Sequence, residues 1–137
     1  MHQAVAMTLE LIAVESLERE YTEAFGLANA VVEAFGEEGL ADRLFNDIPD
    51  SVPFNLVCRL FDLLTWQTND NGAAIYRTVE RWLIEGRDLR KAQIALNLDF
   101  FPFPDEQQMY RVLSLLAAKV PQLADRCEQL ISARRRR

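Results

Sequence analysis

Carboxylates are the side chains in this sequence that could do acid–base chemistry, and one of them stands in a polar cluster: Glu80 with Arg77, Arg81 and Arg87. Nothing in the sequence forces these groups into a cleft, so surface ion pairs on a solvated helix are the simpler interpretation. The single histidine is His2, at a terminus expected to fray, which argues against imidazole catalysis and histidine-rich metal sites. We therefore expect a protein that is not an enzyme.

Metal and phosphate sites are also not indicated. Asn69-Asp70-Asn71-Gly72 is rich in oxygen ligands like the start of a calcium loop, but no glutamate closes the loop at the required position, so we interpret it as a structural turn. The five glycines are isolated, which excludes a Gly-rich phosphate loop. Cys58 and Cys127 lie far apart and are expected to be small buried thiols. No cofactor is expected.

The elements that would position these groups are helices, because apolar residues recur at helical spacing and no segment alternates over the length of a strand. Gly26 is expected to bend or break the first helix. The expected helices cover residues 5–25, 27–35, 38–45, 53–66, 75–85, 89–98, 105–120 and 121–131. The fold class is thus all-α, either an irregular multi-helix bundle or a short HEAT- or TPR-like array of antiparallel helical hairpins.

The chain length of 137 residues, half of them apolar, suits one domain with one core. We predict a single helical domain over residues 1–133 and a disordered, solubilising tail over Arg134–Arg137, with contact to nucleic acid or to an acidic partner as the alternative role of the tail. Both tryptophans, Trp66 and Trp82, are expected in the core. The proline-interrupted loop Phe101-Pro102-Phe103-Pro104 cannot easily bury its backbone, so Phe101 and Phe103 are candidate contact residues on the surface.

Charge is unevenly placed along the chain. Residues 1–50 contain eleven acids and two bases, whereas residues 51–133 are nearly neutral. An acidic body repels phosphate backbones, so the folded domain is not expected to bind nucleic acid, and a basic protein is the expected partner. No apolar stretch approaches the length of about 20 residues that spans a bilayer, and no signal peptide is recognisable. We expect no membrane association and a cytoplasmic location.

A small, acidic, helical protein without catalytic groups resembles the immunity proteins that neutralise basic toxin domains by steric and electrostatic blocking. The resemblance lies in size, charge and helicity, and no residue motif carries it. The sequence points to an acidic partner-binding surface with a neighbouring aromatic as the buried anchor, and the candidate acidic residues are Glu15, Glu18, Glu37, Glu38 and Asp42. Phe101 and Phe103 are the candidate residues of an apolar docking site for the partner. The alternative is a helical-repeat adapter or scaffold protein that binds its partner in a groove.

Overall fold

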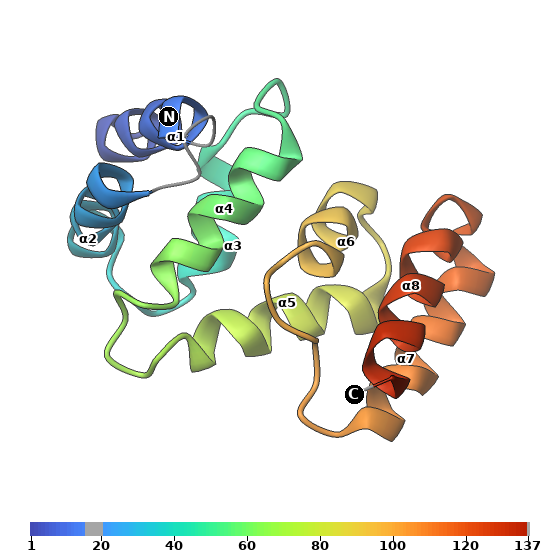
Figure 1. Cartoon of the computed structure of the whole chain (residues 1–137). Coiled ribbons are helices and arrows are strands. Elements are labelled where there is room, and N and C mark those ends of the chain that lie inside the picture. The colour runs from blue at the N-terminus through green and yellow to red at the C-terminus, as the bar shows by residue number, and fades with distance from the viewer. Residues whose placement is uncertain (16–20, 137) are drawn as a thin grey trace. The chain divides into compact units, whose positions relative to one another are not determined.

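The computed structural model describes residues 1–15 and 21–136, and these residues form helices joined by turns and loops (Figure 1). No strand occurs in the described ranges, which confirms the all-α class. No helix in them is long and apolar enough to cross a membrane. The helices are α1 (Gln3–Glu15), α2 (Thr22–Phe35), α3 (Leu40–Asp47), α4 (Phe54–Leu64), α5 (Ala73–Glu85), α6 (Leu89–Leu96), α7 (Glu106–Lys119), the 3₁₀ helix η1 (Pro121–Leu123) and α8 (Ala124–Arg135).

Two compact units make up the chain, Met1–Thr78 and Val79–Arg137, and the boundary between them falls inside α5. That residues 1–133 form a single helical domain stays a prediction.

In the first unit α1 packs against α2, and both helices contact α4 (Figure 1). Helix α4 shows why the sequence folds this way. Its apolar residues recur every three or four positions, so one face of the helix is continuously apolar and must be buried. The buried residues on this face are Val57, Cys58, Leu60, Phe61 and Leu64. Helices α1 and α2, which contact α4, and α3, which contacts α2, contribute further buried aliphatic residues, among them Ile12, Val31 and Leu44.

Two expectations about the first unit are wrong. Gly26 lies inside α2 and does not interrupt it. A glycine inside a helix costs about 1 kcal/mol relative to alanine, and the buried side chains of Ala24, Ala28 and Val31 outweigh that cost. Trp66 was expected in the core, but α4 ends at Leu64, and Trp66 in the following turn is 77% exposed. The other tryptophan, Trp82, is 2% exposed, as expected.

The turn before α5 is built by hydrogen bonds to two polar side chains. The backbone N–H of Gly72 donates to Thr68 Oγ1 at 2.8 Å and to Asp70 Oδ1 at 3.1 Å, and the N–H of Ala74 donates to Asp70 Oδ2 at 3.0 Å. Gly72 has a φ of 83°, and a Cβ atom here would lie 2.7 Å from Thr65 Cβ. The polar stretch that resembles a calcium loop in sequence thus serves to start a helix.

The second unit contains two helix starts that follow the sequence signals. Asp88 Oδ1 accepts a hydrogen bond from Lys91 N, and Asp105 Oδ1 accepts one from Gln107 N, each at 3.0 Å. Helices α7 and α8 pack together as a hairpin connected through η1, and α6 contacts α8 (Figure 1). Their shared core includes Ile94, Leu96, Met109, Leu113 and Cys127.

Both cysteines are free and buried, as the sequence predicted. Burial raises the pKa of the Cys127 thiol to about 11, which the charge of Glu128 supports and that of Arg126 opposes. Because the thiolate is the reactive form, this cysteine is held in its unreactive thiol state at neutral pH.

Candidate functional site

Three of the predicted acidic residues come together where α2 meets α3, and we call Glu37, Glu38 and Asp42 the acidic corner. The chain turns there through Gly36 and Gly39, whose φ values of 75° and 62° lie in the region that favours glycine. Glu38 is exposed, whereas Glu37 and Asp42 are half-buried.

The backbone around the acidic corner interacts with two of its carboxylates. Glu37 Oε1 accepts a hydrogen bond from Asn69 N at 2.8 Å. Asp42 lies in the first turn of α3, where the partial positive charge of the helix N-terminus stabilises a carboxylate. Arg43 donates to the carbonyl oxygen of Phe35 and lies over the Phe35 ring, 5.4 Å from its centre. Arg43, which lies beside the acidic corner, thus contacts the last residue of α2.

The two remaining acidic candidates do not belong to this corner. Glu15 is 8% exposed, and its Oε1 accepts hydrogen bonds from Glu23 N and Ala24 N, each at 3.0 Å. Its carboxylate therefore caps the start of α2 and is not available to a partner. Glu18 lies outside the described residues.

Formal charge divides at the boundary between the two units. Residues 1–78 contain thirteen acids and four bases, a net charge of −9, and residues 79–137 contain eight acids and eleven bases, a net charge of +3. The overall charge of −6 thus hides two units of opposite sign. The acidic corner lies in the strongly negative unit.

The two predicted phenylalanines have different surroundings. Phe103 is 2% exposed and adopts a positive φ of 66°. Its N–H donates to Glu80 Oε2 at 3.0 Å, and its carbonyl oxygen accepts from Arg134 Nη1 at 2.7 Å. Phe103 is thus a core residue held by two charged side chains. Phe101 is half-buried and faces a pocket.

Arg134 holds this loop from the end of α8. Its guanidinium donates to the carbonyl oxygens of Pro102, Phe103 and Pro104 at 2.7–3.1 Å and lies over the Phe101 ring, 5.5 Å from its centre. The structure differs here from the predicted tail of residues 134–137, since Arg134 and Arg135 form the last turn of α8. Arginine can do this because its planar group presents several donors at once, which satisfies carbonyls that a proline-rich loop cannot pair internally.

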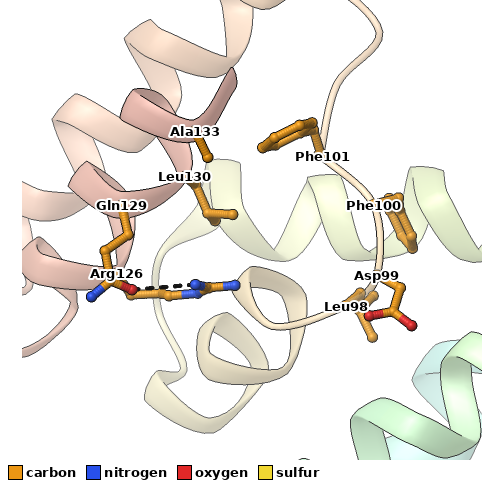
Figure 2. A pocket seen from close by; sticks show the side chains of 8 residues that line it. All are labelled: Leu98, Asp99, Phe100, Phe101, Arg126, Gln129, Leu130 and Ala133. Carbon is orange, nitrogen blue, oxygen red and sulfur yellow. Dashed lines mark hydrogen bonds between the residues drawn. The ribbon is translucent and has the colours of Figure 1, made fainter. Parts of the chain in front are cut away.

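A pocket of about 680 Å³ lies between residues 98–101 and α8, and we call it the α8 pocket (Figure 2). Phe101, Leu130 and Ala133 lie at one end in Figure 2, and Arg126 extends along the other. Arg126 Nε donates to the Leu96 carbonyl oxygen at 3.0 Å, and its Nη1 donates to Gln129 Oε1 at 3.2 Å. The pocket lining comprises Leu98, Asp99, Phe100, Phe101, Arg126, Gln129, Leu130 and Ala133.

Comparisons with protein-family models, curated proteins and solved structures found no match. Function therefore has to be inferred from the two features just described, the acidic corner and the α8 pocket.

Sequence reasoning identified one residue of the α8 pocket, Phe101, and missed the helix side. A signal for the missed residues exists. Arg126, Gln129, Leu130 and Ala133 follow one another at intervals of three, one and three, so they share one face of a helix. These four residues are partly polar and partly apolar, as on an ordinary helix surface. Only the loop at residues 98–101, which lies opposite them in the structure, shows that they line a pocket.

Proposed function

We propose that this chain is a non-catalytic, cytoplasmic protein-binding protein whose acidic corner binds a basic surface of another protein, as immunity proteins do with basic toxin domains. The observation that carries the proposal is the charge of −9 on residues 1–78 beside +3 on residues 79–137. Solubility can be provided by charge spread over a whole molecule, whereas charge gathered in one unit favours attraction and orientation of a partner.

The acidic corner has the properties that such a role requires. Glu38 is exposed and can approach a lysine or arginine of the partner directly. Glu37 is held by the hydrogen bond from Asn69 N, so little freedom of this side chain would be lost on binding. Complementary charges of this kind speed association more than they slow dissociation. The expected mode of action is steric, because an acidic surface that covers a toxin's basic site excludes its substrate.

The test is binding of the full chain to a panel of purified basic toxin domains, measured by biolayer interferometry beside neutral and acidic domains of similar size. The variant Glu37→Gln/Glu38→Gln/Asp42→Asn removes three charges from the corner. The amide oxygen that replaces the Glu37 carboxylate can still accept from Asn69 N, so the local turn is preserved. The matched control Glu106→Gln/Asp125→Asn/Glu128→Gln removes three exposed charges from the second unit.

We expect basic domains to bind preferentially and the corner variant to lower the association rate about tenfold or more, while the control variant changes it little. Association should also slow as salt rises past about 0.15 M, where the Debye length is about 8 Å. Equal binding of basic and neutral domains at low salt would contradict the proposal. So would an association rate that is unchanged both by salt and by the substitutions in the acidic corner. The latter result would favour a helical adapter that binds through apolar contacts.

A further inference from the structure

We propose that the α8 pocket is a binding site for a small organic acid that has one negative charge and an apolar, preferably aromatic, body. The pocket lies wholly in the second unit, so this inference is independent of the acidic corner and of the function proposed for it. Its volume of about 680 Å³ is within the range of roughly 300–1,000 Å³ that small-molecule sites occupy.

The apolar part of the pocket is preformed. Leu98 and Leu130 are anchored in the core, and each presents the remainder of its side chain to the cavity. The Phe101 ring is held by the Arg134 guanidinium, which the carbonyls of residues 102–104 keep in place. A rigid aromatic wall can stack on a flat ligand without the entropy cost of first ordering a loop.

Arg126 supplies the charge that would select an acid (Figure 2). Its two hydrogen bonds, to the Leu96 carbonyl and to Gln129, fix the side chain along the pocket wall. Both acceptors are uncharged, and within residues 1–15 and 21–136 Arg126 forms no ion pair with a carboxylate. A half-buried guanidinium whose charge is not neutralised attracts a carboxylate and can donate to it.

The number of cationic residues in the lining limits how much negative charge the ligand can carry. Among the residues that line the pocket, Arg126 is the one with a positive charge, and Asp99 lies on the loop side opposite α8 (Figure 2). One guanidinium can pair with one carboxylate, whereas a second negative group on the ligand would find no cationic partner in the lining. The lining thus favours aromatic or aliphatic monocarboxylates over dicarboxylates and phosphate esters.

The test is titration of the full chain with 2-naphthoate, followed by isothermal calorimetry and by ¹H–¹⁵N spectra. The uncharged 2-naphthamide has nearly the same shape and serves as the ligand control. We expect naphthoate to bind with a Kd below about 1 mM and to shift amide signals of residues 98–101 and 126–133. The amide should bind about tenfold or more weakly, because it lacks the charge-assisted bond to Arg126.

Two variant pairs locate the site. Arg126→Gln should weaken naphthoate binding about tenfold or more, and the exposed Arg111→Gln on α7, with the same charge change, should not. Ala133→Leu should block binding by filling the pocket, whereas Ala118→Leu at an exposed position should not. If Arg126→Gln fails to fold, the Ala133 and Ala118 variants and the comparison of naphthoate with naphthamide still decide whether the α8 pocket binds the acid.

Naphthoate that binds no better than its amide would overturn the proposal. So would signal shifts confined to residues outside the α8 pocket, or affinity that is unchanged in Ala133→Leu.

Discussion

How much a single side chain contributes to the stability of this protein depends on its burial, and the two tryptophans show this most clearly. Trp82 is enclosed in the second unit, where it contributes apolar area to the core. Trp66 lies just beyond Leu64, the last residue of α4, and faces solvent. A large apolar side chain at an exposed position contributes little to folding, so two residues of the same type have opposite importance.

The first prediction compares Leu60 with Trp66. Leu60→Ala should lower the free energy of unfolding by roughly 2–5 kcal/mol, because it leaves a cavity in the core of the first unit. Trp66→Ala should change it by less than about 0.5 kcal/mol, despite the larger side chain removed. Urea denaturation followed by circular dichroism measures both. A loss above about 2 kcal/mol in Trp66→Ala would show that the tryptophan is covered in solution.

The second prediction concerns Asp70 and pH. Burial alone would raise the pKa of Asp70, but hydrogen bonds from Ala74, Thr68 and Gly72 and the charge of Arg77 hold the pKa below its ordinary value. A carboxyl with a lowered pKa in the folded state stabilises the fold at neutral pH. That contribution disappears as the pH falls below about 4 and through the lowered pKa.

Asp70→Asn should therefore unfold at a lower urea concentration than the wild type at pH 7, with the difference shrinking steadily toward pH 2. Denaturation curves at several pH values measure this difference. A difference that stays constant across the range would mean that the charge of Asp70 does not stabilise the turn.

At the scale of helices, a side chain of one element can cap another helix or hold a loop in place. Glu15, the last residue of α1, caps α2 through Glu23 N and Ala24 N. Glu15→Ala should lower the free energy of unfolding by about 0.5–2 kcal/mol, the usual cost of losing a helix cap. The exposed Glu10 on the same helix is the control, and Glu10→Ala should have almost no effect. Equal effects of the two substitutions in urea denaturation would contradict the capping role.

The bonds of Arg134 to the loop at residues 102–104 give the next prediction. Arg134→Ala would leave carbonyl oxygens of Pro102, Phe103 and Pro104 without this donor, so we expect a loss of roughly 1–3 kcal/mol in the free energy of unfolding. Arg136→Ala removes an exposed arginine two residues later and should cost little. Thermal unfolding of the two variants distinguishes a docked Arg134 from a solvated tail. If the tail is solvated, both variants have the melting temperature of the wild type.

Helix types and most helix ends could be predicted from the sequence because their signals are local. Asp88 and Asp105 stand directly before apolar periodic segments, and both cap helices in the structure. The contact of Arg134 with Pro104 joins residues thirty positions apart, and the cap of α2 joins α1 to the next helix. No local pattern encodes such pairings, which form only when helices pack.

The same limit applies to the candidate sites. The acidic residues could be counted in the sequence, but burial of Glu15 and exposure of Glu38 depend on which helix each one meets. Likewise, the prolines around Phe101 and Phe103 indicated a loop but not its path. The hydrogen bond from Phe103 N to Glu80 turns that residue inward and leaves Phe101 at the pocket. Tertiary contacts thus decide between two residues that look equivalent in sequence.

At the scale of the whole molecule, the two units share one helix. Helix α5 starts in the unit Met1–Thr78 and ends in the unit Val79–Arg137, and Ile75 and Trp82 are buried on either side of the boundary. Helix formation is cooperative along the chain, so loss of the packing that holds one end of α5 weakens the other end. This coupling supports the prediction of one domain over residues 1–133.

We therefore expect a single transition in differential scanning calorimetry, with the van't Hoff enthalpy close to the calorimetric enthalpy. Leu60→Ala weakens the first unit and Leu113→Ala weakens the second, and both leucines are buried completely. In a cooperative domain each substitution lowers the midpoint of the one transition by several degrees and leaves its shape unchanged. If the units unfold independently, each variant instead moves one of two transitions and leaves the other in place, and that result would show that the boundary inside α5 separates two domains.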